Sequence, residues 1–112
     1  MTPQKPTNSP MQVNRRQFHR RIFQGSIEIE WGSTVLTGTV RDIGPRGLFV
    51  KMTSPLWIGA TFTARLLIDP ILQLHCIVRR VEPGSGVGLM FEEPQGSAKL
   101  QLDQLLANLP EI

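Results

Sequence analysis

From residue 22 onward, hydrophobic and polar positions alternate in short segments that are separated by turn-forming residues. A repeat of two is the pattern of a strand that is buried on one face only. In the first segment, residues 27–31, isoleucine and tryptophan alternate with glutamate, and Gly32 and Ser33 then predict a two-residue hairpin turn. The six predicted strands lie near residues 27–31, 35–41, 48–52, 61–68, 72–81 and 87–91.

Six strands with short connections indicate an all-β domain, either a small antiparallel barrel or a sandwich. Closing the sheet into a barrel would remove its exposed edges. The period changes at the C-terminal end, where leucines recur every three to four residues and predict an amphipathic helix at about residues 97–109. Ser97 is the expected N-cap of this helix, and Pro110 ends the pattern. The leucines of its apolar face are Leu102, Leu105, Leu106 and Leu109.

Length and composition limit the architecture to one small domain. The chain has 112 residues, of which 40% are hydrophobic, and this is enough for one modest core. No apolar run approaches the roughly 18 residues of a membrane-spanning helix, so we expect no membrane span. Residues 1–14 contain several prolines and few large apolar residues. We therefore expect a flexible tail there, followed by the folded domain at residues 15–112.

Few residues are available for catalysis or for binding a metal. The single cysteine, Cys76, excludes an intramolecular disulfide, and residues 1–14 lack the apolar segment of a signal peptide. Both observations fit a reducing, cytoplasmic location. Two histidines and one cysteine without matched spacing form no metal motif. We therefore predict that the protein is not an enzyme and holds no metal or cofactor, with Cys76 in the core and His75 as an ordinary strand residue.

Positive charge is concentrated near the N-terminus. The formal net charge is +3, but the first 25 residues contain no acidic residue. A cluster of this kind usually marks an anionic partner such as a phosphate-bearing ligand, a nucleic acid or a membrane surface. The basic residues of this segment are Lys5, Arg15, Arg16, Arg20 and Arg21.

Two short segments carry the candidate chemistry. Residues 15–21, RRQFHRR, place four guanidiniums close together, and a guanidinium binds phosphate oxygens or the O6/N7 edge of guanine through paired donors. Residues 42–47, DIGPRG, form a turn-rich loop in which the carboxylate of Asp42 could accept hydrogen bonds from the N1/N2 edge of a guanine. Gly44 and Gly47 allow backbone conformations and close approaches that other residues do not.

In this order and at this spacing, the two segments resemble the motifs of the PilZ domain family. Members carry R-x-x-x-R just before the first strand, which Arg16 and Arg20 fit, and then (D/N)-x-S-x-x-G, which Asp42 and Gly47 fit. The stretch at residues 76–91 resembles the closing hairpin of the family, and the likeness extends over roughly residues 14–108. The resemblance implies a six-stranded antiparallel barrel with a C-terminal helix.

The resemblance also implies a function and the residues that perform it. PilZ domains bind the bacterial second messenger cyclic di-GMP, so Arg16 and Arg20 would contact phosphates and guanine edges, and Asp42 would read a guanine. Gly47 would give the loop its shape. Arg15 directly precedes the motif, as in members that take an intercalated ligand dimer. The leading hypothesis is a stand-alone cyclic di-GMP receptor that signals through an unidentified protein partner.

One departure from the family pattern keeps an alternative open. Gly44 stands where the family has serine. Losing the hydroxyl removes a hydrogen bond of about 0.5–1.5 kcal/mol, so we expect weakened binding. The alternative is a ligand-free PilZ-like module that docks onto motility or pilus machinery. Binding of single-stranded nucleic acid is disfavoured, because the chain has no tyrosine and most of its other aromatic residues fall at apolar strand positions.

Overall fold

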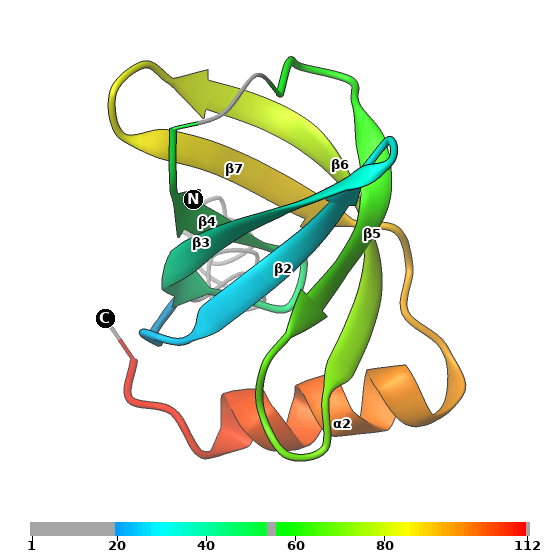
Figure 1. The fold of residues 1–112 in the computed structure, drawn as a ribbon. Helices are drawn as coiled ribbons and strands as arrows, with labels where there is room; N and C mark the ends of the chain where they lie inside the picture. Colours follow the sequence, from blue (N-terminus) through cyan, green and yellow to red (C-terminus); the bar gives the residue numbers. More distant parts are fainter. Residues whose placement is uncertain (1–19, 54–55, 112) are drawn as a thin grey trace, which may run out of the picture.

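The computed structural model describes residues 20–53 and 56–111, so the predicted tail and both Arg15 and Arg16 lie outside the described residues. The described part contains seven strands and one helix (Figure 1). The elements are β1 (Arg21–Ile22), β2 (Ser26–Trp31), β3 (Thr34–Ile43), β4 (Gly47–Lys51), β5 (Thr61–Leu66), β6 (Leu72–Glu82), β7 (Gly86–Phe91) and α2 (Gly96–Ala107).

The strands form one antiparallel sheet that closes on itself. Their order is β1-β3-β2-β5-β6-β7-β4, and an additional pairing of β3 with β4 completes the barrel. The six predicted strands and the hairpin turn at Gly32 and Ser33 are confirmed, with Trp31 opposite Thr34 across that turn. Strand β1, which pairs with the end of β3, was not predicted. A two-residue strand is too short to show an alternating pattern.

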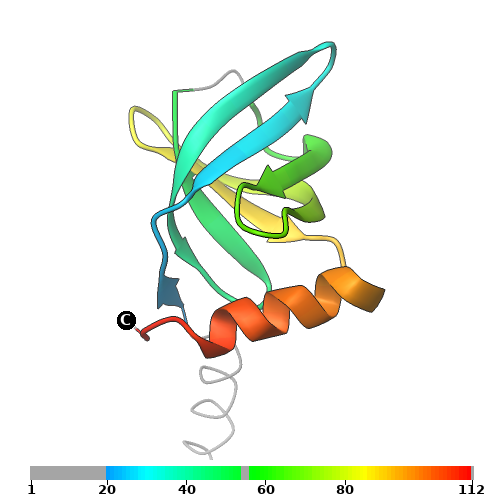
Figure 2. The same cartoon turned by 60° about the horizontal axis from the view of Figure 1, so that its bottom comes forward.

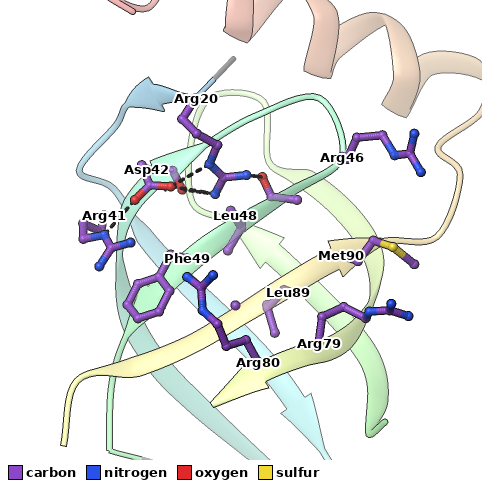
Figure 3. Close-up of a pocket in the computed structure, with 12 residues that line it drawn as sticks. Arg20, Arg41, Asp42, Arg46, Leu48, Phe49, Arg79, Arg80, Leu89 and Met90 are labelled. Carbon is purple, nitrogen blue, oxygen red and sulfur yellow. Dashed lines mark hydrogen bonds and ion pairs between the residues drawn. The ribbon is translucent and has the colours of Figure 1, made fainter. Parts of the chain in front are cut away.

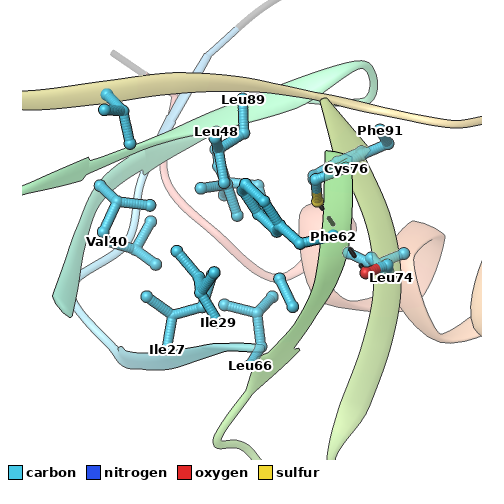
Figure 4. Packing of buried hydrophobic residues seen from close by; sticks show 14 of the residues in the cluster. Ile27, Ile29, Val40, Leu48, Phe62, Leu66, Leu74, Cys76, Leu89 and Phe91 are labelled. Atoms are coloured by element: carbon cyan, nitrogen blue, oxygen red, sulfur yellow. Dashed lines mark hydrogen bonds between the residues drawn. The ribbon is translucent and has the colours of Figure 1, made fainter. Parts of the chain in front are cut away.

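The inward-facing side chains of the strands fill the barrel (Figure 4). Ile27 and Ile29 on β2 and Val40 on β3 are completely buried, as the alternation of these strands requires. Cys76 on β6 is also completely buried, which confirms the predicted core thiol. Burial raises the pKa of this thiol to about 12, and the negative charge of Glu92 adds to the effect.

Helix α2 covers one end of the barrel (Figures 1 and 2). The predicted apolar face is confirmed, because Leu102 and Leu106 are buried and Leu105 and Leu109 pack against the core. Closing this end removes water from the lower part of the core, which stabilises both the helix and the barrel. No helix in the described ranges is long and apolar enough to cross a membrane.

Both ends of α2 differ from the prediction. The helix begins at Gly96, so its N-cap is Gln95 and not Ser97, and Gln95 makes no side-chain capping bond. Gly96 has a φ of +61°, which glycine adopts without strain. The helix ends at Ala107 and not at residue 109. The N–H groups of Asn108 and Leu109 bond to carbonyls only three residues back, which tightens the last turn out of α-helical geometry.

The segment after the helix returns to β1. The N–H of Ile22 donates to the carbonyl oxygen of Pro110 over 3.2 Å, and the Arg21 guanidinium lies 3.4 Å from the Glu111 carboxylate. Strand β1 is therefore held between β3 on one side and the C-terminal segment on the other. This arrangement fixes the backbone next to Arg20, the one residue of the R-x-x-x-R motif that the structure describes.

Candidate functional site

A β-bulge brings the aspartate of the second motif to the outer surface of the barrel. The register between β3 and β4 shifts between Val40 and Asp42, so Arg41 is an extra residue. In a regular strand Val40 and Asp42 would face the same side. The bulge instead leaves Val40 and Ile43 in the core and directs Arg41 and Asp42 to the outside.

The carboxylate of Asp42 is held by two arginines (Figure 3). Nε and Nη2 of Arg20 donate to its Oδ1 over 2.8 and 2.6 Å, and Nε of Arg41 donates to its Oδ2 over 2.7 Å. Arg20 also donates from Nη1 to the carbonyl oxygen of Gly47 over 3.2 Å. Asp42 is only 7% exposed, whereas the side chains of Arg20 and Arg41 are 39% and 46% exposed, so water partly screens these charge-assisted bonds.

This arrangement determines the charge state of Asp42. Burial on its own raises the pKa of the carboxyl group, but the hydrogen bonds from Arg41 and Arg20 and their positive charges lower it by more. The net result is a pKa below the usual 3.8. Asp42 is therefore ionised at neutral pH and acts only as a hydrogen-bond acceptor.

The two glycines of the second motif have different roles in the loop. A Cβ at Gly47 would overlap the carbonyl oxygen of Leu89, so this position must be glycine for β4 to lie against β7. Gly47 therefore allows a close approach, as predicted, and the group that approaches it is the backbone of β7. The Gly44 N–H donates to the Gly47 carbonyl oxygen over 2.8 Å and closes the loop. Gly44 is buried and is not among the described glycines with positive φ.

Arg20 and Asp42 lie at the edge of a cavity of about 570 Å³ on the outer wall formed by β3, β4, β6 and β7 (Figure 3). This volume is in the range of small-molecule sites, about 300–1,000 Å³. Five arginines and a single carboxylate, that of Asp42, line the cavity within the described ranges. The arginines are Arg20, Arg41, Arg46, Arg79 and Arg80. The cavity therefore suits an anionic ligand.

A second bulge supplies two of these arginines. The register between β6 and β7 shifts between Val78 and Arg80, and both Arg79 and Arg80 are exposed on the wall of the cavity. Arg79 and Arg80 were not predicted as site residues, and neither were Arg41 and Arg46. A signal was present for the pair, because the alternation of β6 is regular up to Val78 and stops at two consecutive arginines.

The structure thus brings together part of the predicted site. Arg20, Asp42 and Gly47 line the cavity, and Gly44 closes the adjoining loop without lining it. Arg15 and Arg16 lie outside the described residues. The residues that the structure describes contain no group of three or more histidines, cysteines or acidic residues that could hold a metal ion.

Comparison with known proteins identifies the family. The model of the PilZ domain matches residues 14–108, most of the chain. The chain belongs to the PilZ domain family. PilZ domains are regulatory binding domains and generally receptors for cyclic di-GMP. The arginine-lined cavity therefore lies in a fold whose members generally bind an anionic nucleotide.

A solved structure shows the same fold. The crystal structure of the PilZ domain of CeSA from a cellulose-synthesizing bacterium is similar to this chain, with a TM-score of 0.64. The two share 22% sequence identity, and the match covers 80% of this chain and 95% of the other. No curated protein sequence matches this chain.

Proposed function

We propose that this PilZ domain binds cyclic di-GMP in the arginine-lined cavity and passes the binding event to a protein partner. One observation carries the proposal. Arg20 and Asp42, which come from two separate family motifs, meet at the edge of a cavity that four more arginines line. The excess of positive charge matches a ligand with two phosphodiester groups.

The chemistry of guanidinium suits both parts of the ligand. Its planar donors pair with phosphate oxygens, and they also match the O6 and N7 acceptors of guanine. Arg20 and Arg79 line the cavity and would make such contacts. Arg16 would add a further contact by its position in the R-x-x-x-R motif. Arg15 directly precedes this motif, as in family members that bind a ligand dimer, and would contact the second ligand molecule if one binds.

In the protein without ligand, the Asp42 carboxylate already accepts hydrogen bonds from two arginines. Its Oδ1 accepts from Arg20 twice, and its Oδ2 accepts from Arg41. A guanine N1–H and N2–H edge must therefore displace Arg20 in order to bind both oxygens. The exchange is balanced, because the released Arg20 guanidinium can pair with a ligand phosphate and Asp42 gains the base edge in return. Ligand binding would then change the partner of Arg20.

Isothermal titration with cyclic di-GMP tests the proposal, with cyclic di-AMP as the matched control. We expect heat from cyclic di-GMP, weaker binding at higher salt because the contacts are ionic, and much weaker binding of the adenine analogue. Absence of binding would reject the receptor function. Equal binding of both dinucleotides would reject guanine reading by Asp42.

A second function is favoured by a different region. Trp57 and Ile58, in the connection before β5, are 59% and 65% exposed, and Trp57 packs edge-on against Trp31 with ring centroids 4.9 Å apart. Neighbouring exposed apolar side chains of this kind are a feature of protein-binding surfaces. Together with Gly44 in place of the family serine, they support an interaction module that has lost its ligand. This reading predicts that the titration described above gives no heat.

A further inference from the structure

Phe49 is an aromatic residue on the outer side of the barrel wall. Strand β4 buries four consecutive residues, Gly47 and then the three apolar residues Leu48, Phe49 and Val50. Leu48 and Val50 belong to the core cluster, whereas Phe49 does not and lines the cavity instead. Phe49 is nevertheless only 1% exposed. Side chains on the outside of the barrel must therefore cover its ring.

Two arginine side chains provide this cover. The guanidinium carbon of Arg41 lies 3.9 Å from the centroid of the Phe49 ring, and that of Arg80 lies 5.5 Å away. Figure 3 shows both guanidiniums beside the ring on the cavity wall. Distances below about 6 Å are those of cation–π contacts, and arginine in particular stacks on aromatic faces.

The sheet register explains how Arg80 reaches the ring from β6, whereas Arg41 is the bulge residue next to Asp42. Asp42 lies opposite Phe49, Phe49 lies opposite Gly88, and Gly88 lies opposite Arg80, in a row across β3, β4, β7 and β6. Gly88 has no side chain, so Arg80 can extend over β7 towards Phe49. A Cβ at Gly88 would be in ordinary contact with Arg80, 3.4 Å from its Cβ and 3.8 Å from its Cζ. The further carbons of a branched side chain would extend beyond this contact towards the Arg80 side chain.

Each arginine also has a surface that the ring does not cover. The side chain of Arg41 is 46% exposed while its Nε is fixed to Asp42, and the side chain of Arg80 is 58% exposed while its Nε pairs with the Glu82 carboxylate over 2.9 Å. A guanidinium that packs against a ring on one face can accept a nucleobase on the other, because bases stack on guanidinium planes. Holding the guanidinium in advance reduces the side-chain entropy that is lost on binding.

We propose that Phe49 is a positioning residue for the ligand. Its ring holds the guanidiniums of Arg41 and Arg80 against the cavity wall, where they form a stacking surface for a purine base. This inference rests on the proposed function and deepens it, since it assigns base stacking to residues outside the two family motifs. Phe49 acts through the arginines and need not touch the ligand itself.

The test compares three variants by titration with cyclic di-GMP and with an analogue in which a fluorescent guanine surrogate that keeps O6 and N1–H replaces one guanine. Phe49→Leu keeps an apolar side chain of similar size but removes the ring. We expect it to weaken binding about 5- to 100-fold, which is the range of one lost base stack, and to reduce the quenching of the analogue at saturation. The salt dependence should stay the same, because every arginine is still present. Phe49→Tyr, which keeps the ring, should retain both affinity and quenching.

Gly88→Val provides a second route that leaves Phe49 in place. It should displace Arg80 from the ring and again reduce both quenching and affinity. Unchanged binding and quenching in Phe49→Leu or in Gly88→Val, with wild-type far-ultraviolet circular dichroism, would overturn the positioning role alone. An equal loss in Phe49→Tyr would also overturn it, because that variant keeps the stack. Absence of binding by the wild-type protein would reject the receptor function and this role with it.

Discussion

Two outer walls of the same barrel differ in both geometry and charge. The wall of β2 and β5 pairs without a register shift, and its charges are matched, since Arg65 lies opposite Glu28 and also contacts Glu30 at 2.5 Å. The wall of β3, β4, β7 and β6 has bulges at Arg41 and Arg79. There five described arginines line the cavity with one carboxylate, that of Asp42, which Arg20 and Arg41 share, and Arg80 pairs with Glu82.

The difference indicates where the barrel can bind a ligand. A regular strand places alternate residues outside, so neighbouring charges on an outer wall pair across strands. A bulge places two consecutive residues outside and so raises the local density of side chains. Of the four residues that the two bulges bring outside, Arg41, Arg79 and Arg80 are cationic and Asp42 is anionic. Among the described residues, positive charge is therefore dense on the wall where the regular alternation is broken.

Replacing one arginine on each wall gives the largest expected contrast. Arg20→Ala should weaken cyclic di-GMP binding by about 1.5–3 kcal/mol, the value of a charge-assisted hydrogen bond, which is about 10- to 150-fold in the dissociation constant. Arg65→Ala, on the regular wall, should leave the dissociation constant unchanged. Isothermal titration measures both. A similar loss in the two variants would show that binding depends on overall charge and that the cavity is not the site.

Replacing one acid on each wall should separate the walls in stability. Asp42→Asn removes the charge shared by Arg20 and Arg41, whose side chains are 39% and 46% exposed. We expect the free energy of unfolding to fall by about 1–2 kcal/mol, below the full value of buried charged hydrogen bonds because of this exposure. Glu30→Gln should change it by no more than about 0.5 kcal/mol. Urea denaturation compares the two, and equal effects would mean that the Asp42 network contributes no more than a surface ion pair.

The lowered pKa of Asp42 predicts a contribution to folding stability that is lost in acid. The pKa of Asp42 lies below 3.8 in the folded protein, so between the folded and unfolded values the unfolded chain binds more protons. Stability from this group is therefore fully present above pH 3.8 and is lost as the pH falls through the lowered pKa. Thermal melting from pH 6 to pH 2 should show a steeper loss for the wild type than for Asp42→Asn. If the melting temperatures of the two proteins fall in parallel with pH, Asp42 does not make this contribution to stability.

The regular part of the molecule was the part that could be predicted. The strands and the apolar face of α2 follow from repeats of two and of three to four residues. The bulges at Arg41 and Arg79 could not be predicted in the same way, because one added residue is set by pairing with β4 and β7 and leaves little trace in composition. Leu48, Phe49 and Val50 are all apolar, so hydrophobicity does not show which of them faces outward. The outward position of Phe49 depends on the register with Asp42 and Gly88.

The candidate site could be predicted only as far as the family motifs extend. Arg20, Asp42 and Gly47 were selected from the motifs, and the structure places them together. Arg79 and Arg80 lie more than 30 residues after the second motif in the sequence. They line the cavity because the closed barrel brings β6 and β7 beside β4. Two features of the sequence show that strict alternation fails at these points. They are the three consecutive apolar residues of β4 and the two consecutive arginines of β6.

The smallest predicted effect concerns the loop between the motif residues. Gly44 does not have a positive φ, so serine can adopt its backbone conformation without left-handed strain. Gly44→Ser would restore the family hydroxyl and reduce the freedom of the unbound loop. We expect cyclic di-GMP affinity to rise by about 0.5–1.5 kcal/mol, or roughly 2- to 12-fold. Titration of Gly44→Ser beside Arg65→Ala, the control from the regular wall, measures the gain. Tighter binding would mean a working receptor that lacks one contact, whereas no binding by either the parent or the serine variant would favour the interaction module and leave the arginine-rich wall without a ligand.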